Sequence, residues 1–575
     1  MICIISHNFT TPMFMYPESG SCACQTDKAC PPKIVTIMQA FLSVLALSTL
    51  CASRLATAKD KEEANWGNVT GTSPVTFPQN VGFGGEQKSG GSPFNAMVDT
   101  LGSDHDDVVE MRWKPKDADK DHSSWEDLWY NLGEFAPYHA AKRVFPDMVS
   151  HSTVPKHCTI KQAHVLHRHG AKFPDKGHKN GPGNFGKIVS DQRKQGKLNV
   201  SGDLSFLEDF DYDLGQKILT HQGSEQMFRS GVKHYYDYAQ LLDKYHKKPV
   251  FRTSSHSRVV DSARYFGLGF FGLDASNHYN LEVLTETDYQ NNTLAPKNAC
   301  RNADNDDFMY DEYLSSQWQD IYLEAPRKRL QKNFHSYNLT KTDVYNMMLS
   351  CPYLTSGIGF SQFCHLFTKE EWENFAYDQD LQLVGKHGFQ NPTARAVGVP
   401  YVQELVSRLQ KHKFTGPVTA QNMTITSNET YFPLDQPLYI DFSHHSVMFS
   451  VVTALNLTQF KEEFNPTKPN PKRKLRSGDV TPMGMRLAWE VLDCEDEDMY
   501  IRLKLNDVVY PLDESNGCEK RNDGLCKLDT YASYLDKHAY DASKFDLACF
   551  GKNGTDFVLT GPVQDGTIPQ HAIKK

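Results

Sequence analysis

Three short apolar segments of the chain are each followed by polar residues and then by a helical pattern. The segments comprise residues 163–166, 250–253 and 438–442, and they lead into 167–170, 257–266 and 443–445. Strand and helix patterns that alternate in this way predict an α/β sheet. Ligands of such folds bind at the carboxyl ends of the strands, where these polar residues lie.

A long helical stretch is predicted between about residues 305 and 412. Val402, Leu405, Val406 and Leu409 show there the i, i+3, i+4, i+7 spacing of a helix with one apolar face. Further on, the segment 503–510 is typical of a β-hairpin whose turn contains an Asn-Asp pair. The chain therefore combines a sheet with a substantial helical part.

The composition indicates a large folded protein with no bulk affinity for nucleic acid. The chain has 575 residues, of which 39% are hydrophobic and 23% are charged, and its net charge is −9. That much apolar material forms a large core and excludes wholesale disorder. The negative net charge argues against a nucleic-acid binder that works through bulk attraction. Any affinity for anions has to come from a local basic cluster.

The N-terminal region predicts export. An apolar run from Ala40 to Cys51, too short to span a bilayer, precedes a small-residue cleavage pattern that ends at Ala58. We interpret residues 38–58 as a signal peptide, 1–37 as a start-site extension and 59–124 as a flexible leader. In the alternative, the run is a signal anchor that keeps residues 1–37 in the cytosol. The first interpretation predicts a secreted protein, extracellular or in the cell wall, without a stable membrane anchor.

Cysteines and sequons support the prediction of export. Beyond residue 58 there are eight cysteines, an even number that fits full pairing in an oxidising compartment: Cys158, Cys300, Cys351, Cys364, Cys494, Cys518, Cys526 and Cys549. Eight glycosylation sequons follow the same point, at Asn68, Asn199, Asn291, Asn338, Asn422, Asn428, Asn456 and Asn553. We therefore expect a disulfide-bonded glycoprotein.

The loop after the first strand carries the densest candidate chemistry. Arg168 and Lys172 place two cations around the imidazole of His169, and Arg252 and His444 belong to the other two strand ends. If the three loops converge, these side chains form a cage for a phosphate dianion. Neighbouring cations lower the pKa of His169, which keeps it neutral and nucleophilic in mild acid. The pattern predicts phosphoryl transfer through a phosphohistidine.

From about Trp129 to its end, the chain resembles the histidine acid phosphatases, and within them the fungal phytases. The motifs that carry the resemblance are VLHRHGAKFP at 165–174, similar to RHGxRxP, then FRTS at 251–254 with RVV at 258–260, CHLFTKEEW at 364–372, NP at 391–392 with VGV at 397–399, EL at 404–405, DFSH at 441–444, and the segment 518–526 bounded by two cysteines. Because these motifs occur in one order, they are far more specific than the RHG triplet alone.

The resemblance implies a phosphoric monoester hydrolase that needs no cofactor. It implies a histidine phosphatase fold, with a doubly wound α/β core at about 125–195, 248–275 and 390–575. A smaller, mostly helical domain would be inserted at about 196–247 and 276–389, with the active site between the two. The implied substrates are phosphomonoesters, with inositol polyphosphates such as phytate among the candidates.

The resemblance also implies roles for individual residues. By position, the nucleophile is His169, the phosphate ligands are Arg168, Arg252 and His444, and Lys176 and Lys179 fall near positions that bind a polyphosphorylated substrate. The implied disulfides are Cys158–Cys494, Cys300–Cys549, Cys351–Cys364 and Cys518–Cys526. Lys172 stands where the family has its second arginine, which keeps the charge but loses the forked donor. His445 stands where the family has the aspartic acid that protonates the leaving alcohol, so it is a candidate proton donor.

Two alternatives stay open from the residues themselves. A catalytically impaired protein of the same fold would bind phosphate or phosphoesters without turnover, since the expected acid is missing. A metal-dependent hydrolase would use His164, His167 and His169 with His444 and His445, but this set lacks a carboxylate or thiolate partner and HxxxH spacing, so we expect no metal. The GxGxxG match at 267–272 follows a helix instead of opening one, which disfavours a dinucleotide site.

Overall fold

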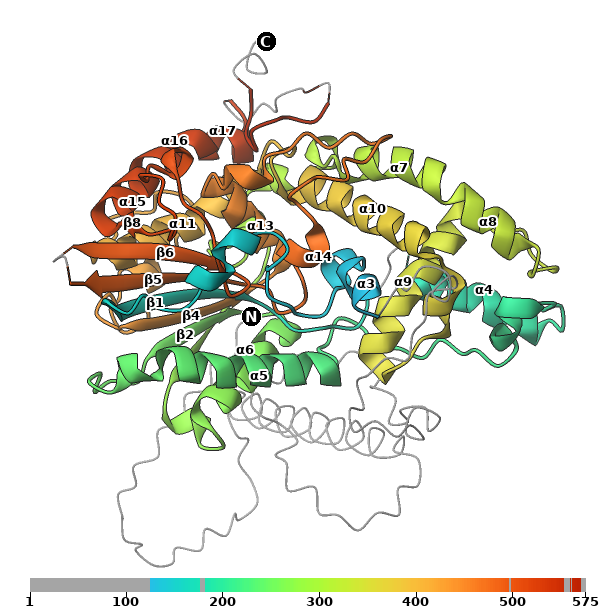
Figure 1. Ribbon diagram of the computed structural model, residues 1–575, viewed down its shortest axis with the longest axis horizontal. Helices are drawn as coiled ribbons and strands as arrows, with labels where there is room; N and C mark the ends of the chain where they lie inside the picture. The colour runs from blue at the N-terminus through green and yellow to red at the C-terminus, as the bar shows by residue number, and fades with distance from the viewer. Residues whose placement is uncertain (1–124, 176–180, 496–497, 553–558, 560, 570–575) are drawn as a thin grey trace, which may run out of the picture. The chain divides into compact units, whose positions relative to one another are not determined.

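A mixed sheet of eight strands forms the centre of the described part of the chain (Figure 1). The computed structural model describes residues 125–175, 181–495, 498–552, 559 and 561–569. The predicted start-site extension, signal peptide and leader lie outside these ranges, as do Lys176, Lys179, Asn68 and Asn553.

The strands follow the order β3-β2-β4-β1-β5-β6-β7, and β8 also pairs with β6. Their bounds are β1 (Cys158–Arg168), β2 (Val250–Ser254), β3 (Asn280–Leu284), β4 (Leu438–Ser443), β5 (Arg486–Cys494), β6 (Met499–Leu505), β7 (Val508–Val509) and β8 (Cys526–Lys527). Strands β1 to β4 pair in parallel, whereas β5 to β8 add antiparallel pairs. The parallel register brings Arg168 of β1 opposite Ser443 of β4, so both strands end at one edge of the sheet.

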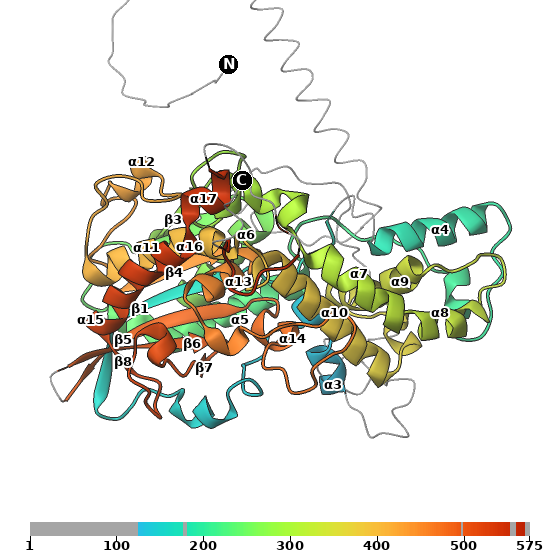
Figure 2. The same ribbon diagram turned by 90° about the horizontal axis from the view of Figure 1, so that it is seen from above.

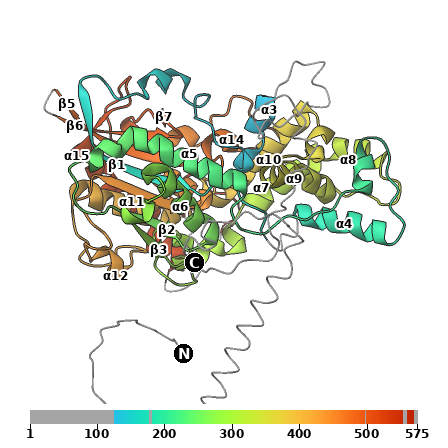
Figure 3. The same ribbon diagram turned by 90° about the horizontal axis from the view of Figure 1, so that it is seen from below.

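Helices cover both faces of the sheet. On one face lie α5 (His221–Tyr238) and α6 (Ser257–Phe271), whose Met227 and Phe266 share an apolar core with Val165 of β1 (Figures 1 and 3). On the other lie α11 (Ala394–Gln410), α13 (His445–Ala454) and α15 (Leu528–Tyr534), which pack with Leu487 and Trp489 of β5. Because β1 is covered on both faces, its last six residues are all buried. The predicted α/β fold class is confirmed.

A second group of helices lies beyond one end of the sheet (Figures 1 and 2). It comprises α4 (Pro182–Lys194), α7 (Asp311–Tyr322), α8 (Glu324–Gln331), α9 (Lys341–Ile358) and α10 (Lys369–His387). Capping boxes begin α9 and α10, where Thr340 pairs with Asp343 and Thr368 with Glu371. The shorter helices are α3 (Trp125–Tyr130), α12 (Met423–Thr426), α14 (Ser477–Val480), α16 (Tyr540–Ser543) and α17 (Phe545–Phe550). The helical stretch predicted for 305–412 is confirmed.

The predicted bounds of the helical insert are wrong at three points. Residues 196–247 were expected in the insert, but α5 packs on the sheet. Residues 276–389 were expected there too, yet β3 pairs with β2 as an edge strand of the sheet. Conversely, α4 falls in the predicted core but packs on α9. A helical period shows that one face is buried, but it does not show which neighbour buries it.

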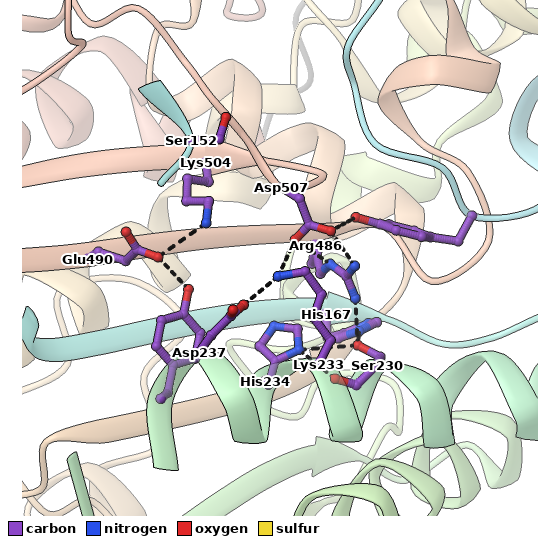
Figure 4. Close-up of polar contacts among 12 residues, drawn as sticks. Ser152, His167, Ser230, Lys233, His234, Asp237, Arg486, Glu490, Lys504 and Asp507 are labelled. Carbon is purple, nitrogen blue, oxygen red and sulfur yellow. Dashed lines mark hydrogen bonds and ion pairs between the residues drawn. The ribbon is translucent and has the colours of Figure 1, made fainter. Parts of the chain in front are cut away.

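The predicted hairpin is confirmed, and its turn anchors a buried polar network. Asn506 and Asp507 link β6 to β7 with φ of 44° and 68°, a left-handed turn that Asn and Asp adopt readily. Figure 4 shows Arg486 between the carboxylate of Asp507, 3.0 Å from Nε, and the hydroxyl of Ser230, 2.7 Å from Nη1. His167 Nε2 contacts the same hydroxyl at 2.7 Å, which ties β1 to α5.

The four disulfides implied by the resemblance are present: Cys158–Cys494, Cys300–Cys549, Cys351–Cys364 and Cys518–Cys526. Four sequon asparagines are exposed, namely Asn199, Asn291, Asn338 and Asn428, whereas Asn422 and Asn456 are half-buried. Asn456 also donates from its amide to the carbonyl of Ser515 at 2.9 Å. Within the described ranges, no helix is both long enough and apolar enough to cross a bilayer.

Candidate functional site

Backbone hydrogen bonds hold the loop that carries His169. Its N–H donates to the carbonyl of Ser443 at 3.2 Å, and its carbonyl accepts from Gly484 at 3.0 Å. Gly170 packs so closely on α5 that a β-carbon there would lie 2.4 Å from the carbonyl oxygen of Gly223. Only glycine fits this approach, so the position of the loop is fixed by packing as well as by hydrogen bonds.

A hydrogen bond to the backbone fixes the tautomer of the His169 imidazole. The ring is 1% exposed, and its Nδ1 lies 2.8 Å from the carbonyl oxygen of Gly170. Because a carbonyl only accepts, Nδ1 carries the proton of the neutral ring and Nε2 keeps its lone pair. Burial, followed by the charges of Arg258 and Arg168, holds the pKa of His169 well below its usual value. The ring is therefore neutral in mild acid.

Arg168 supplies buried donors beside His169. Its Nη1 donates to the carbonyl of Glu134 at 2.7 Å and to that of Thr481. Its Nε and Nη2 have no hydrogen-bond partner among the described residues, although the Glu134 carboxylate lies 3.6 Å from Nη2. Burial lowers the pKa of Arg168 to about 10, so it stays charged in acid. Burying such donors without an acceptor costs folding free energy. A phosphate oxygen can serve as that acceptor.

Arg258 and Lys172 complete the basic cluster around His169. Arg258 lies in the first turn of α6 and reaches His444, whose Nδ1 is 3.4 Å from its Nη2. No ion pair to Arg258 is found within the described ranges, and its Nε has no hydrogen-bond partner there. Lys172 is buried and donates to Asp175 at 3.0 Å. Burial lowers the pKa of Lys172, an effect that Asp175 opposes.

His444 connects the basic cluster to a carboxylate. Its ring centroid is 5.7 Å from that of His169, and its Nε2 is 2.7 Å from Oε1 of Glu286. Burial opposes ionisation of Glu286, but His444 outweighs it and lowers the carboxyl pKa to about 2. His256 contacts the other carboxylate oxygen at 3.3 Å. His256, Glu286 and His444 are thus the residues at this site that could hold a metal ion.

His445 begins helix α13 next to His444 and pairs with Glu134. Its Nε2 lies 2.7 Å from Oε2 of Glu134, and its ring is 5.8 Å from that of His387. Its Nδ1 is buried and has no hydrogen-bond partner in the part of the chain described. Burial lowers the pKa of His445, while Glu134 raises it. The candidate proton donor therefore has a carboxylate beside it.

The structure does not bring Arg252 into the basic cluster, which corrects the prediction for that residue. Arg252 lies within β2, not at its end, and its register partner is Asp441 of β4. Its Nε and Nη2 donate to Asp441 at 2.8 and 3.1 Å, and Nη2 also donates to Glu404 at 2.8 Å. Arg408 adds a second cation, 2.6 Å from Asp441. These four side chains form a buried charge network within the fold.

Two histidines proposed for the alternative metal site make separate contacts elsewhere in the fold. His164 stacks on Tyr439 with ring centroids 4.6 Å apart, and His167 turns to Ser230 on α5. Packing of β1 on its two sides explains both positions, and His164 is fully buried.

Three residues of the site were not predicted from the sequence: Arg258, Glu134 and Glu286. Arg258 belongs to a motif quoted above, and its place in the first turn of a helix after a strand is a signal for anion binding. Glu134 and Glu286 lie in a short helix before β1 and in the loop after β3. No sequence spacing relates them to His444 or His445, so only the fold reveals them.

A family model agrees with this geometry. Residues 159–506 match the model for the histidine phosphatase superfamily, branch 2. The chain belongs to this family. The predicted family and enzyme class, a phosphoric monoester hydrolase of the histidine acid phosphatases, are confirmed.

Relatives of this branch 2 histidine phosphatase span most of its length. It is 31% identical to Phytase A of Aspergillus oryzae over 434 residues, which cover 71% of this chain and 87% of the relative. It is 28% identical to an acid phosphatase of Schizosaccharomyces pombe over 421 residues, which cover 70% and 86%. The crystal structure of the D. castellii phytase has the same fold, with a TM-score of 0.62 at 21% identity over 76% of this chain and 91% of that one.

Proposed function

We propose that this phosphatase is a secreted, acid-active enzyme that hydrolyses phosphomonoesters through a phosphohistidine at His169, and that phytate is among its substrates. The observation that carries the proposal is the buried imidazole of His169 beside cationic donors that have no hydrogen-bond partner among the described residues. Arg168 contributes Nε and Nη2 to this set, and Arg258 contributes Nε. These donors match the oxygens of a phosphate dianion in number and charge.

In the first step, Nε2 of His169 attacks phosphorus while the bond from phosphorus to the leaving oxygen breaks. A proton reaches that oxygen, and the alcohol departs. In the second step, water attacks the phosphohistidine, the bond between nitrogen and phosphorus breaks, and orthophosphate leaves. The transferring group carries its charge on three equatorial oxygens, which Arg168, Arg258 and Lys172 stabilise in both steps.

Activity in acid follows from the charge states of these groups. Burial and the neighbouring cations depress the pKa of His169, so lowering the pH does not protonate the nucleophile until well below its usual value. Burial leaves the pKa of Arg168 at about 10, so its charge persists throughout the acid range. The predicted signal peptide and the four disulfides support secretion.

The relatives support phytate as one substrate. Relatives of this chain include several named Phytase A, and a B. longum multiple inositol polyphosphate phosphatase, crystallised with inositol hexasulfate, shares the fold with a TM-score of 0.51 at 14% identity. That structure covers 71% of this chain and 97% of the other. Lys176 and Lys179 stay candidates for contacts to additional phosphates.

The test is turnover of p-nitrophenyl phosphate and phytate by the purified glycoprotein between pH 3 and 7, with rapid acid-free quench and detection of phosphohistidine. We expect phosphate release from both substrates and a phosphohistidine that is absent from His169→Ala. Phosphate binding by calorimetry without a phosphohistidine would overturn the proposal in favour of the non-catalytic binder. Activity that a chelator abolishes and zinc restores would favour the metal-dependent alternative, with His256, Glu286 and His444 as the ligands to replace.

A further inference from the structure

Glu134 and His445 form an ion pair at the edge of the basic cluster, where Oε2 of Glu134 also lies 3.6 Å from Nη2 of Arg168. His445 is the first residue of α13, directly after the phosphate-binding candidate His444. Glu134 comes from a distant part of the chain, the short helix Gly133–Phe135 before β1, and its Oε2 lies 2.7 Å from Nε2 of His445. The two side chains are 25% and 24% exposed, so they border the buried cluster without being sealed in it.

We propose that Glu134 and His445 act together as the proton donor of the phosphatase, with Nδ1–H of His445 as the donating group and Glu134 as the residue that positions and charges it. The proposal rests on the proposed function, since it names the acid for the same reaction. Because Glu134 occupies the Nε2 side of the ring, Nδ1 is the nitrogen left to face a leaving oxygen. Within the described chain that nitrogen has no hydrogen-bond partner.

Charge arithmetic explains why a pair can replace the carboxylic acid expected at this position. A carboxylic acid is neutral before it gives up its proton and carries one negative charge afterwards. An imidazolium beside a carboxylate is likewise neutral as a pair, and after proton transfer the pair also carries one negative charge. The basic cluster therefore experiences the same change in charge in both cases, whereas a histidine alone would add a cation to it.

The groups around His445 make the carboxylate necessary. The charges of Arg168 and His444 act on the ring of His445, and the ring of His387 on α10 lies 5.8 Å from it. The amino-terminal end of α13 adds the positive end of a helix dipole. Burial is the largest effect that lowers the pKa of His445, and the charges of Arg168 and His444 add to it, so Glu134 is the described group that raises this pKa. The carboxylate itself stays ionised, because His445 and then Arg168 outweigh its burial and hold its pKa well below the usual range.

The proton balance of the step is simple. As the bond between phosphorus and the leaving oxygen breaks, Nδ1 gives its proton to that oxygen, and the ring becomes neutral imidazole beside ionised Glu134. In the second step, the attacking water returns a proton to Nδ1 as its oxygen bonds to phosphorus. The acid of the first step is thus the base of the second.

The experiment compares two leaving groups in the glycosylated full-length enzyme. p-Nitrophenolate leaves without help, whereas the alkoxide of glycerol 2-phosphate needs a proton. We expect Glu134→Gln to reduce kcat/KM for glycerol 2-phosphate by about 10²-fold, the scale of general acid catalysis, and to change that for p-nitrophenyl phosphate much less.

Asp175→Asn is the matched control, since Asp175 is also a carboxylate at the edge of the cluster and pairs with Lys172. A carboxylate that only tunes phosphate binding affects both substrates alike, so this variant should show no leaving-group dependence. The double variant Glu134→Gln, His445→Asp should recover glycerol 2-phosphate turnover relative to Glu134→Gln, because an aspartic acid needs no partner. Recovery also shows that Glu134→Gln did not simply misfold.

The outcomes separate this inference from the function on which it rests. Wild-type enzyme that forms a phosphohistidine, combined with equal losses on both substrates in Glu134→Gln, overturns the donor pair and leaves the phosphatase proposal standing. Failure of the wild type to form a phosphohistidine overturns both.

Discussion

Arg252 and Arg258 lie six residues apart on one strand–helix unit, yet their guanidinium groups have opposite surroundings. Arg252 makes three hydrogen bonds to the carboxylates of Asp441 on β4 and Glu404 on α11. Arg258 has no ion pair within the described ranges, and its guanidinium hydrogen-bonds to the ring nitrogen of His444. Each guanidinium has one buried nitrogen without a hydrogen-bond partner in the described chain, Nη1 of Arg252 and Nε of Arg258, so the carboxylates make the difference. A cation paired by carboxylates stabilises the fold, whereas one without a carboxylate partner can attract an anion. The partners of an arginine, more than the motif that contains it, indicate which of the two roles it has.

The largest expected effect comes from removing the nucleophile of the cluster that contains Arg258. His169→Ala should reduce turnover of p-nitrophenyl phosphate by a factor on the order of 10⁴ or more, the scale seen when a covalent nucleophile is lost. The cations remain, so phosphate should still bind. Stopped-flow turnover and calorimetric phosphate binding measure the two quantities, and a variant that loses binding but keeps turnover would contradict the assignment.

Arg252→Met should destabilise the buried charge network that contains Arg252 and leave the basic cluster around His169 intact. Removing one partner of a buried ion pair leaves carboxylates uncompensated, which typically destabilises a fold by about 3–5 kcal/mol. Urea unfolding monitored by tryptophan fluorescence measures this loss. Activity per folded molecule should change little at low temperature. A stable Arg252→Met variant with weakened phosphate binding would instead restore Arg252 as a ligand.

Arg258→Met is the matched substitution in the cluster around His169. We expect a fall in kcat of about 10²–10³-fold, the effect of losing one donor to a developing charge in a preorganised site. The urea midpoint should move much less than in Arg252→Met, because no carboxylate of the described chain depends on Arg258. Equal shifts of the urea midpoint in Arg252→Met and Arg258→Met would show that the two arginines do not differ in this way.

The pH dependence of folding stability offers a test of the buried polar network in Figure 4. Burial, followed by Arg486, lowers the pKa of His167 from 6.5 to about 3. As the pH falls below 6.5, the unfolded chain takes up a proton that the folded chain refuses, so stability declines until about pH 3, where the folded chain also accepts one. His167→Gln should flatten this decline. Urea midpoints at pH 7, 5 and 4 measure it, with the exposed His221→Gln as a control that should leave the decline unchanged.

Lys172→Arg is expected to have the smallest effect. Arginine would restore a forked donor at a position where lysine offers a point charge, which favours phosphate by about 1 kcal/mol or less. A several-fold lower inhibition constant for orthophosphate, with the same urea midpoint, would be the result. A higher inhibition constant would show that the pairing of Lys172 with Asp175 is what places the charge.

The difference between Arg252 and Arg258 also shows which parts of the site the sequence could predict. His169, Arg168, Lys172 and His444 were predicted because they follow strands whose carboxyl ends meet at one edge. Arg252 was wrongly included, since an apolar segment shows where a strand lies but not at which residue it stops. The hairpin and the long helical part were predicted correctly from local patterns. Glu134 and Glu286 could not be predicted, because contacts between distant segments leave no spacing in the sequence.

The close approach of Gly170 and Gly223 has a consequence for variation of the enzyme. A β-carbon at Gly223 would lie 2.1 Å from the carbonyl oxygen of Ala171, just as one at Gly170 would meet Gly223. In a mutational library selected for activity, both positions should survive only as glycine, and neither can be rescued by changing the other. The backbone on either side of the His169 imidazole would therefore keep its place while other parts of the protein vary.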